Sequence, residues 1–169
     1  MAFYVAEPVG GGRRKWWGAW AKMPVSLVEW SNSFKEKDHF INFAEFVALV
    51  AVYLSVPEVV RGRFVLHFGD NETANQTAIK GSSRARDLAE AVTTLRFVWL
   101  SLQVSPWVAR VASKSNPADG PTRDDFSFEK WVQGRGEVLE WVEFVCPDLG
   151  GWDCFGGEGA WRTIVGERG

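Results

Sequence analysis

The segment VLHFGDNETA, residues 65–74, decides the fold of this chain. A short apolar run ends at Asp70 and is followed at once by a polar helix start that continues to Lys80-Gly81. This order predicts a strand, an acid at its carboxyl end and a helix beside it. In an open α/β sheet, ligands and metals collect at this edge. Asp70 is therefore the first candidate for a functional acid, and a simple helix N-cap is its alternative role.

Length and composition limit the class of protein. The 169 residues make one ordinary domain, and a hydrophobic fraction of 46% excludes disorder. The longest apolar run, around residues 46–54, is too short to cross a bilayer, and no signal-peptide pattern opens the chain. We therefore expect an intracellular protein, cytoplasmic or nuclear, that is neither secreted nor held in a membrane.

Charge and cysteine content exclude two further classes. A formal net charge of −2 argues against gripping nucleic acid by bulk electrostatics, but it allows a local basic edge that works with bound divalent cations. Cys146 and Cys154 lie close together in the sequence, as free thiols or as a local bridge. Two cysteines without a flanking histidine are too few for a zinc site.

The remaining periodicities predict alternating element types. The predicted strands cover 2–7, 16–23, 25–30, 63–69 and 107–112, and the predicted helices cover 42–55, 71–81, 83–103, 124–133 and 137–145. The expected fold is α/β, with a five-stranded mixed sheet (three antiparallel strands, then two parallel ones) flanked by helices. The strand at 63–69 is apolar enough to be covered on both faces. We expect one domain over 1–134, and a C-terminal helix with an irregular Gly/Trp-rich tail over 135–169.

Two more acids stand in recognisable settings. Glu45 lies inside an apolar helix, at the capping-box position after Asn42. Asp119 lies in SNPADGP, residues 115–121. Taken singly, these acids have ordinary explanations as a capping-box Glu and a turn Asp. Together with Asp70 they are three acids in recognisable settings, which gives more weight to Asp70 as a functional acid.

Five short motifs, in order, resemble ribonuclease H type 1, and specifically the domain of retroelement reverse transcriptases. The resemblance covers roughly residues 2–123 and implies the ribonuclease H-like fold. The motifs are FYV at 3–5, WGA at 17–19, INFAEFVAL at 41–49, FGDN at 68–71 with Ala74, and SKSNPADGPTR at 113–123 after Val111.

The resemblance also implies a chemistry for the acids. Glu45, Asp70 and Asp119 match the family's catalytic residues, which hold two Mg²⁺ or Mn²⁺ ions and hydrolyse the RNA strand of an RNA–DNA hybrid. The implied partners are the hybrid itself and a polymerase domain of the same polyprotein. The isolated domain is expected to be a monomer.

The first strand departs from the family pattern. Family members carry a metal-bridging Asp where this chain has Ala6. Glu7 points to the opposite face of a regular strand and could substitute only through a bulge at Glu7-Pro8. The chain is therefore expected to be inactive or slow. The alternative function is a non-catalytic ribonuclease H-fold module, for hybrid binding or for a structural role; a partner-docking role of the tail is a third possibility.

Polar side chains near the acids are candidates for contacts to the hybrid. RNA is recognised through its 2′-hydroxyls in the wide minor groove, and DNA strands are held through their phosphates. The candidates for the first role are Asn42, Asn71 and Asn75. Those for phosphate contacts are Ser82, Arg84, Arg86 and Lys114.

Overall fold

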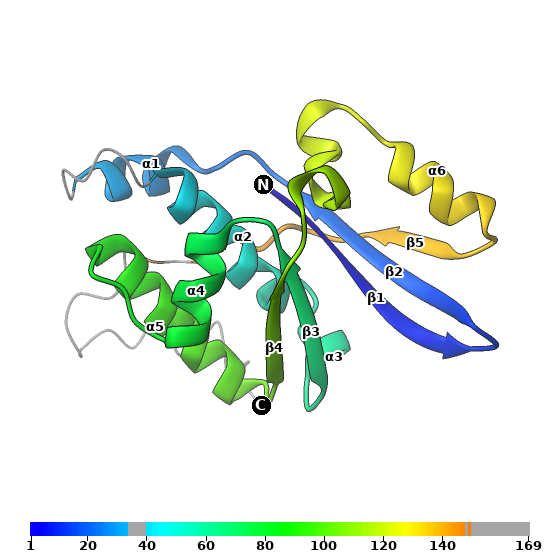
Figure 1. The fold of residues 1–169 in the computed structure, drawn as a ribbon, viewed down its shortest axis with the longest axis horizontal. Coiled ribbons are helices and arrows are strands. Elements are labelled where there is room, and N and C mark those ends of the chain that lie inside the picture. The colour runs from blue at the N-terminus through cyan, green and yellow to red at the C-terminus, as the bar shows by residue number, and fades with distance from the viewer. Residues whose placement is uncertain (34–39, 148, 150–169) are drawn as a thin grey trace, which may run out of the picture.

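The computed structural model describes residues 1–33, 40–147 and 149 (Figure 1). The strands are β1 Ala2–Gly10, β2 Arg13–Trp20, β3 Phe64–Gly69, β4 Ser105–Arg110 and β5 Val138–Trp141. The helices are α1 Val25–Asn32, α2 Phe40–Ser55, α3 Pro57–Val60, α4 Glu72–Lys80, α5 Arg86–Ser101 and α6 Ser127–Gly134. Short 3-10 turns at Ser113–Ser115, Pro117–Asp119 and Pro121–Arg123 connect β4 to α6. The tail from 150 onward, with Cys154, lies outside the described residues.

The fold is α/β, with the strands divided between two sheets. β1 and β2 pair in antiparallel orientation, and β5 joins β2 in parallel. β3 and β4 form a separate parallel pair. Among the described residues no ladder joins β1 to β3, so the prediction of one continuous five-stranded sheet was wrong.

The segment 25–30 was predicted to be a strand and is instead the helix α1. Pro24 occupies its N-cap position, where a missing N–H costs nothing. Leu27 and Ser31 are buried four residues apart, whereas Val25 remains 69% exposed. The buried positions are therefore spaced as in a helix, and this segment forms a helix rather than a strand.

The segment 137–145 was predicted to be a helix and contains the strand β5. Gly136 has a φ of 67°, a left-handed conformation that separates this segment from α6. The following residues pair with β2, Val138 opposite Lys15 and Trp141 opposite Gly18. Pairing with β2, near the other end of the chain, therefore determined that this segment is a strand. β5 takes the place beside β2 that was predicted for residues 25–30.

β1 runs opposite to β3. Contacts at both ends show this direction. The N-terminal amine before β1 lies in the electrostatic field of Glu45 near the start of α2, whereas Glu7 pairs with Arg63 just before β3.

The predicted elements around residue 70 are confirmed. β3 ends at Gly69, and the Asn71 side chain caps α4 by accepting a hydrogen bond from the Ala74 N–H. Gly81 ends α4 in the left-handed conformation with a φ of 71°, as expected for a helix C-cap. The predicted helices at 42–55, 83–103 and 124–133 correspond to α2, α5 and α6.

The core is centred on α2, which packs against α5, α4 and β1. Its fully buried side chains include Phe43, Phe46, Val50 and Tyr53. Burying a side chain of this size stabilises a fold by about 1.5–3 kcal/mol. Among the described residues, no helix is long and apolar enough to cross a membrane.

The outer face of the β3–β4 pair is exposed, contrary to the prediction that both faces of β3 are covered. Phe64, Leu66, Phe68 and Trp107 are 57–66% exposed on this face. The helix α6 does not cover them because it packs on β5 and on aromatic side chains of β1 and β2.

Candidate acidic site

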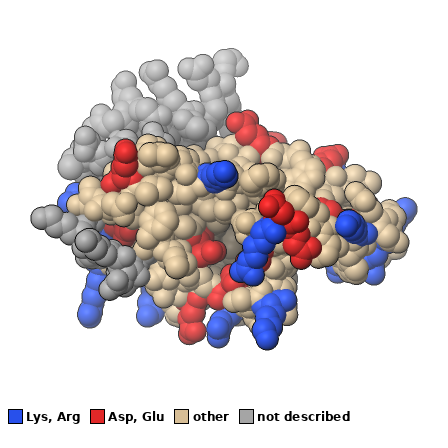
Figure 2. Space-filling model, turned by 90° about the horizontal axis from the view of Figure 1, so that it is seen from above, with Lys and Arg blue, Asp and Glu red and all other residues tan. Residues whose placement is uncertain are grey.

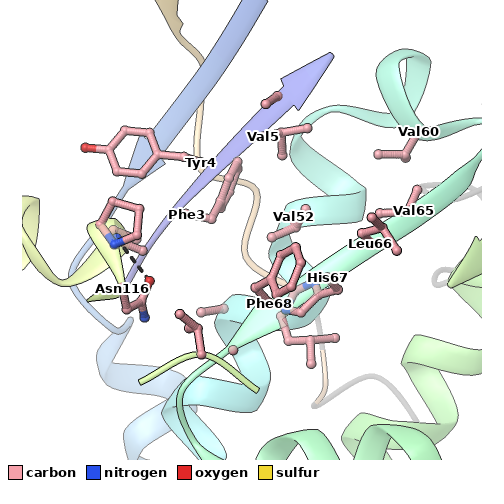
Figure 3. A pocket seen from close by; sticks show the side chains of 18 of the residues that line it. Phe3, Tyr4, Val5, Val52, Val60, Val65, Leu66, His67, Phe68 and Asn116 are labelled. Atoms are coloured by element: carbon pink, nitrogen blue, oxygen red, sulfur yellow. Dashed lines mark hydrogen bonds between the residues drawn. The ribbon is translucent and has the colours of Figure 1, made fainter. Parts of the chain in front are cut away.

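A cavity of about 760 Å³ lies between β1 and β3, where the two sheets face one another without pairing (Figure 3). Most of its wall is apolar, with Phe3 and Val5 from β1 opposite Leu66 and Phe68 from β3. Polar groups line it where β3 ends. They are Glu45, Asp70, Asn71, Asn75 and Asn116.

The structure brings the three predicted acids into one electrostatic neighbourhood. Glu45 comes from the second turn of α2, Asp70 follows β3, and Asp119 ends a 3-10 turn. Desolvation raises the pKa of Glu45, and the negative charges of Asp70 and Asp119 raise it further. The pKa of Asp119 is also raised, by desolvation and then by Asp70, while Arg123 opposes the shift.

Asn116 lies between two of these acids. Its Nδ2 donates hydrogen bonds to Asp70 Oδ1 at 3.0 Å and to Asp119 Oδ1 at 3.5 Å. Its Oδ1 accepts from the Ala118 N–H at 3.2 Å, which fixes the orientation of the amide. The side chain therefore stabilises both carboxylates by hydrogen bonding, without changing their charge. In the sequence, Asn116 stood out only as part of the motif at 113–123, although an Asn before a Pro signals a side chain that turns back on its own backbone.

The donor chemistry of this site suits a hard cation, because carboxylate oxygens are the ligands that Mg²⁺ and Mn²⁺ prefer. The present geometry is incomplete for that purpose. In the part of the chain that the structure describes, no group of three or more His, Cys, Asp or Glu side chains is placed to hold a metal ion. Glu45 and Asp70 line the same cavity, with the Asn116 amide between Asp70 and Asp119.

Ala6 and Glu7 line the same cavity as Glu45 and Asp70, but they lie toward the Arg63 end of β3. Tyr4 and Phe3 lie on the side of the cavity near Asn116, and Val5 lies farther along β1 toward Val60 (Figure 3). Ala6 is exposed beyond them, and the Glu7 carboxylate pairs with Arg63 at the other end of β3. Because β1 runs opposite to β3, Ala6 lies nearer to the start of β3 than to Asp70 at its end.

The three asparagines predicted to contact RNA are engaged within the protein. Asn71 Nδ2 donates to Asn42 Oδ1 at 3.0 Å, and Asn71 Oδ1 caps α4. Asn75 is buried and donates to the Gly69 carbonyl at 2.8 Å. These contacts fix the turn between β3 and α4, and so they hold Asp70 in position.

The predicted phosphate contacts lie on the surface. Ser82, Arg84 and Lys114 are exposed, and Arg86 pairs with Glu90 at 3.2 Å on the first turns of α5. Near the other end of the sequence, Cys146 is half-buried and free, and burial raises its thiol pKa to about 11. That thiol is therefore poorly suited to nucleophilic chemistry at neutral pH.

No family model, curated protein or solved structure matches this chain. The functional assignment therefore depends on the residues of the chain itself and on the arrangement of Glu45, Asp70 and Asp119.

Proposed function

We propose that this chain is a ribonuclease H-like domain of a retroelement reverse transcriptase that engages RNA–DNA hybrids through a divalent cation at Glu45, Asp70 and Asp119. One observation carries the proposal. Three acids from segments far apart in sequence lie in one another's electrostatic fields, and two of them have raised pKa values. Like charges at such a site are costly unless a cation or a proton compensates them.

In this proposal each acid has a distinct way of reaching the site. Asp70 is fixed by the capped turn after β3, and Asp119 by its 3-10 turn, so these two form the rigid part. Glu45 is partly open to solvent and lines the same cavity as Asp70. A bound Mg²⁺ or Mn²⁺ pair activates a water and stabilises the leaving 3′ oxygen of a phosphodiester. Arg123 pairs with Asp119 at 3.2 Å and remains open to a phosphate.

Catalysis is expected to be weak, since no fourth acid from β1 reaches the cluster. Two described features favour the second candidate, a non-catalytic hybrid-binding module. Asn116 donates hydrogen bonds to Asp70 and Asp119, and Ala6 stands where the family sequence carries its bridging acid. The two candidates share the fold and the partner and differ only in hydrolysis.

A calorimetric Mn²⁺ titration of the whole chain tests the cation site. Asp70→Asn keeps the shape of the side chain and removes its charge, so affinity should fall on the order of 100-fold, as expected when a group organising a metal site is lost. Glu58→Gln is the matched control, because Glu58 is an exposed acid on α3. Equal binding by the original chain and Asp70→Asn would refute the proposal.

A cleavage assay with a labelled RNA–DNA hybrid then separates the two candidates. Slow, Mn²⁺-dependent cutting of the RNA strand that Asp70→Asn abolishes supports the nuclease. Cation binding with no cutting, but with hybrid binding that the cation strengthens, supports the binding module.

A further inference from the structure

Basic and aromatic side chains gather at the end of the molecule away from the acids. We call this surface the basic–aromatic end; it consists of the β1–β2 hairpin tip with α6 and the turn into β5. A strand of nine residues such as β1 is roughly 30 Å long, so the tip is well separated from Asp70. Lys and Arg side chains cluster on the right in Figure 2, where Figure 1 places the hairpin. The residues are Arg13, Arg14, Lys15, Trp16, Phe128, Lys130, Trp131 and Arg135.

The aromatic rings form a fixed platform. Phe128 and Trp131 stack with ring centroids 5.6 Å apart and planes 22° apart. Trp16 meets Phe128 edge-on at 5.1 Å, and its Nε1 donates to Glu137 Oε2 at 2.7 Å. Trp131 nevertheless leaves 47% of its surface exposed. A large ring held rigidly and left half-open is a low-cost stacking surface.

Cations lie against these rings and beside them. The Arg14 guanidinium carbon is 5.9 Å from the centroid of Trp16, and that of Arg135 is 5.0 Å from the centroid of Trp131. Arg13, Arg14 and Lys130 are exposed and, among the described residues, have no carboxylate within 4.0 Å. Lys15 and Arg135 are paired, with Glu140 and Glu137. The surface thus has three cations without a salt bridge around the exposed ring of Trp131, and one of them, Arg14, also lies in the electrostatic field of Glu137. The chain as a whole carries a net charge of −2.

We propose that the basic–aromatic end binds single-stranded nucleic acid. Unpaired bases stack on aromatic and guanidinium planes, while cations next to them neutralise the backbone phosphates. A duplex would hide its base faces from Trp131, and an acidic peptide would use the cations but not the ring. The proposal extends the proposed function to a single strand that continues beyond the hybrid, and it does not depend on the acids.

Fluorescence anisotropy of the whole chain with a labelled oligothymidylate of about 12 nucleotides tests this surface, because known stacking grooves cover about 4–16 nucleotides. The triple variant Arg13→Ala, Arg14→Ala, Lys130→Ala should bind at least about tenfold more weakly at low salt. Single strands contribute about 0.7 per phosphate to the slope of log K against log salt, so the slope should decrease by about 2. These are exposed positions, so the variant should keep its circular dichroism spectrum.

Trp131→Ala tests stacking separately. It should weaken binding by about tenfold, and that loss should persist at high salt, because base stacking is worth about 1–3 kcal/mol per base. Arg110→Ala is the control; it removes an exposed cation on β4 that pairs with Glu72 at 3.6 Å, far from the hairpin tip.

Three results would overturn the proposal. They are a triple variant that binds like Arg110→Ala, oligothymidylate binding too weak to saturate at low salt, and competition by polyglutamate as strong as competition by unlabelled oligonucleotide. Asp70→Asn should bind the oligonucleotide normally. Failure of the acidic site and failure of this surface can therefore be told apart.

Discussion

Two halves of the molecule meet at the cavity, and they were assembled in different ways. The βαβ half, residues 64–110, contains β3, α4, α5 and β4 in sequence order. The hairpin half, residues 1–20 and 127–141, joins β1 and β2 to a strand and a helix from the other end of the chain. Asp70 belongs to the βαβ half, Asp119 to the turn after it, and Glu45 to α2 between the halves. The hairpin half contributes no acid to the site, and the βαβ half contributes only Asp70.

The largest expected effect is loss of stability from the βαβ half. Leu95 on α5 is fully buried in the core. Leu95→Ala should lower the free energy of unfolding by about 2–5 kcal/mol, because it removes apolar contact and leaves a cavity. Urea denaturation measures this change, with the exposed Leu100→Ala on the same helix as control. Equal costs for the two variants would mean that α5 does not anchor the core.

A smaller loss is expected where the hairpin half is held together. Glu129 on α6 is buried and accepts a hydrogen bond from the Tyr4 hydroxyl on β1. Glu129→Ala should cost about 1–3 kcal/mol in unfolding free energy, because it leaves that hydroxyl without its partner. Denaturation of Glu129→Gln, which can still accept the hydrogen bond, should show a smaller loss. If Glu129→Ala lowered the free energy of unfolding no more than a substitution at an exposed position does, α6 would contribute little to holding this half together.

Asn116→Asp tests whether the acidic site binds a divalent cation. A third carboxylate beside Asp70 and Asp119 should raise Mn²⁺ affinity about tenfold, because affinity for hard cations grows with ligand charge. The same change should lower stability without metal, since the amide that donated hydrogen bonds to both acids is gone. Calorimetry and thermal unfolding with and without Mn²⁺ measure both effects. Asn116→Ala should give only the second, and an Asn116→Asp variant with unchanged affinity would contradict this geometry.

The raised pKa of Glu45 gives a pH dependence with a definite sign. An acid whose pKa is higher in the folded protein than its ordinary 4.5 destabilises the fold when it ionises, so stability is lost as pH rises through the folded value. Glu45→Gln should therefore make the metal-free protein more stable at pH 7 and no more stable at pH 3. Mn²⁺ should stabilise the original chain more than the variant. Thermal unfolding across pH 3–7 would contradict this if the variant were less stable at pH 7.

The smallest expected effect concerns Ala6. Because β1 runs away from the acids toward Arg63, Ala6→Asp should leave Mn²⁺ affinity and hybrid cleavage within about threefold of the original chain, as exposed charges a Debye length apart are largely screened. The family register instead implies a gain of orders of magnitude. A gain of that size would show that β1 approaches β3 in the opposite direction.

The sequence by itself determined the elements whose signals are local. Asp70 after an apolar run, the Asn71 cap and the Gly81 stop fixed β3 and α4, and the apolar spacing of residues 42–55 fixed α2. The gathering of Glu45, Asp70 and Asp119 was implied by the family resemblance, whereas the local signals placed only each acid in its own element. Each acid follows or lies within an element whose ends are set by neighbouring residues.

The tertiary structure decided what depends on pairing between distant segments. Residues 25–30 and 138–141 are short apolar stretches that fit a helix or a strand, and only contacts across the chain selected between them. The direction of β1 relative to β3 was likewise set by packing between distant segments. The place of Ala6 relative to the acids and the gathering of Arg14 with Trp131 both follow from that direction and from the docking of α6. No local pattern encodes them, because they arise from the free energy of packing whole elements together.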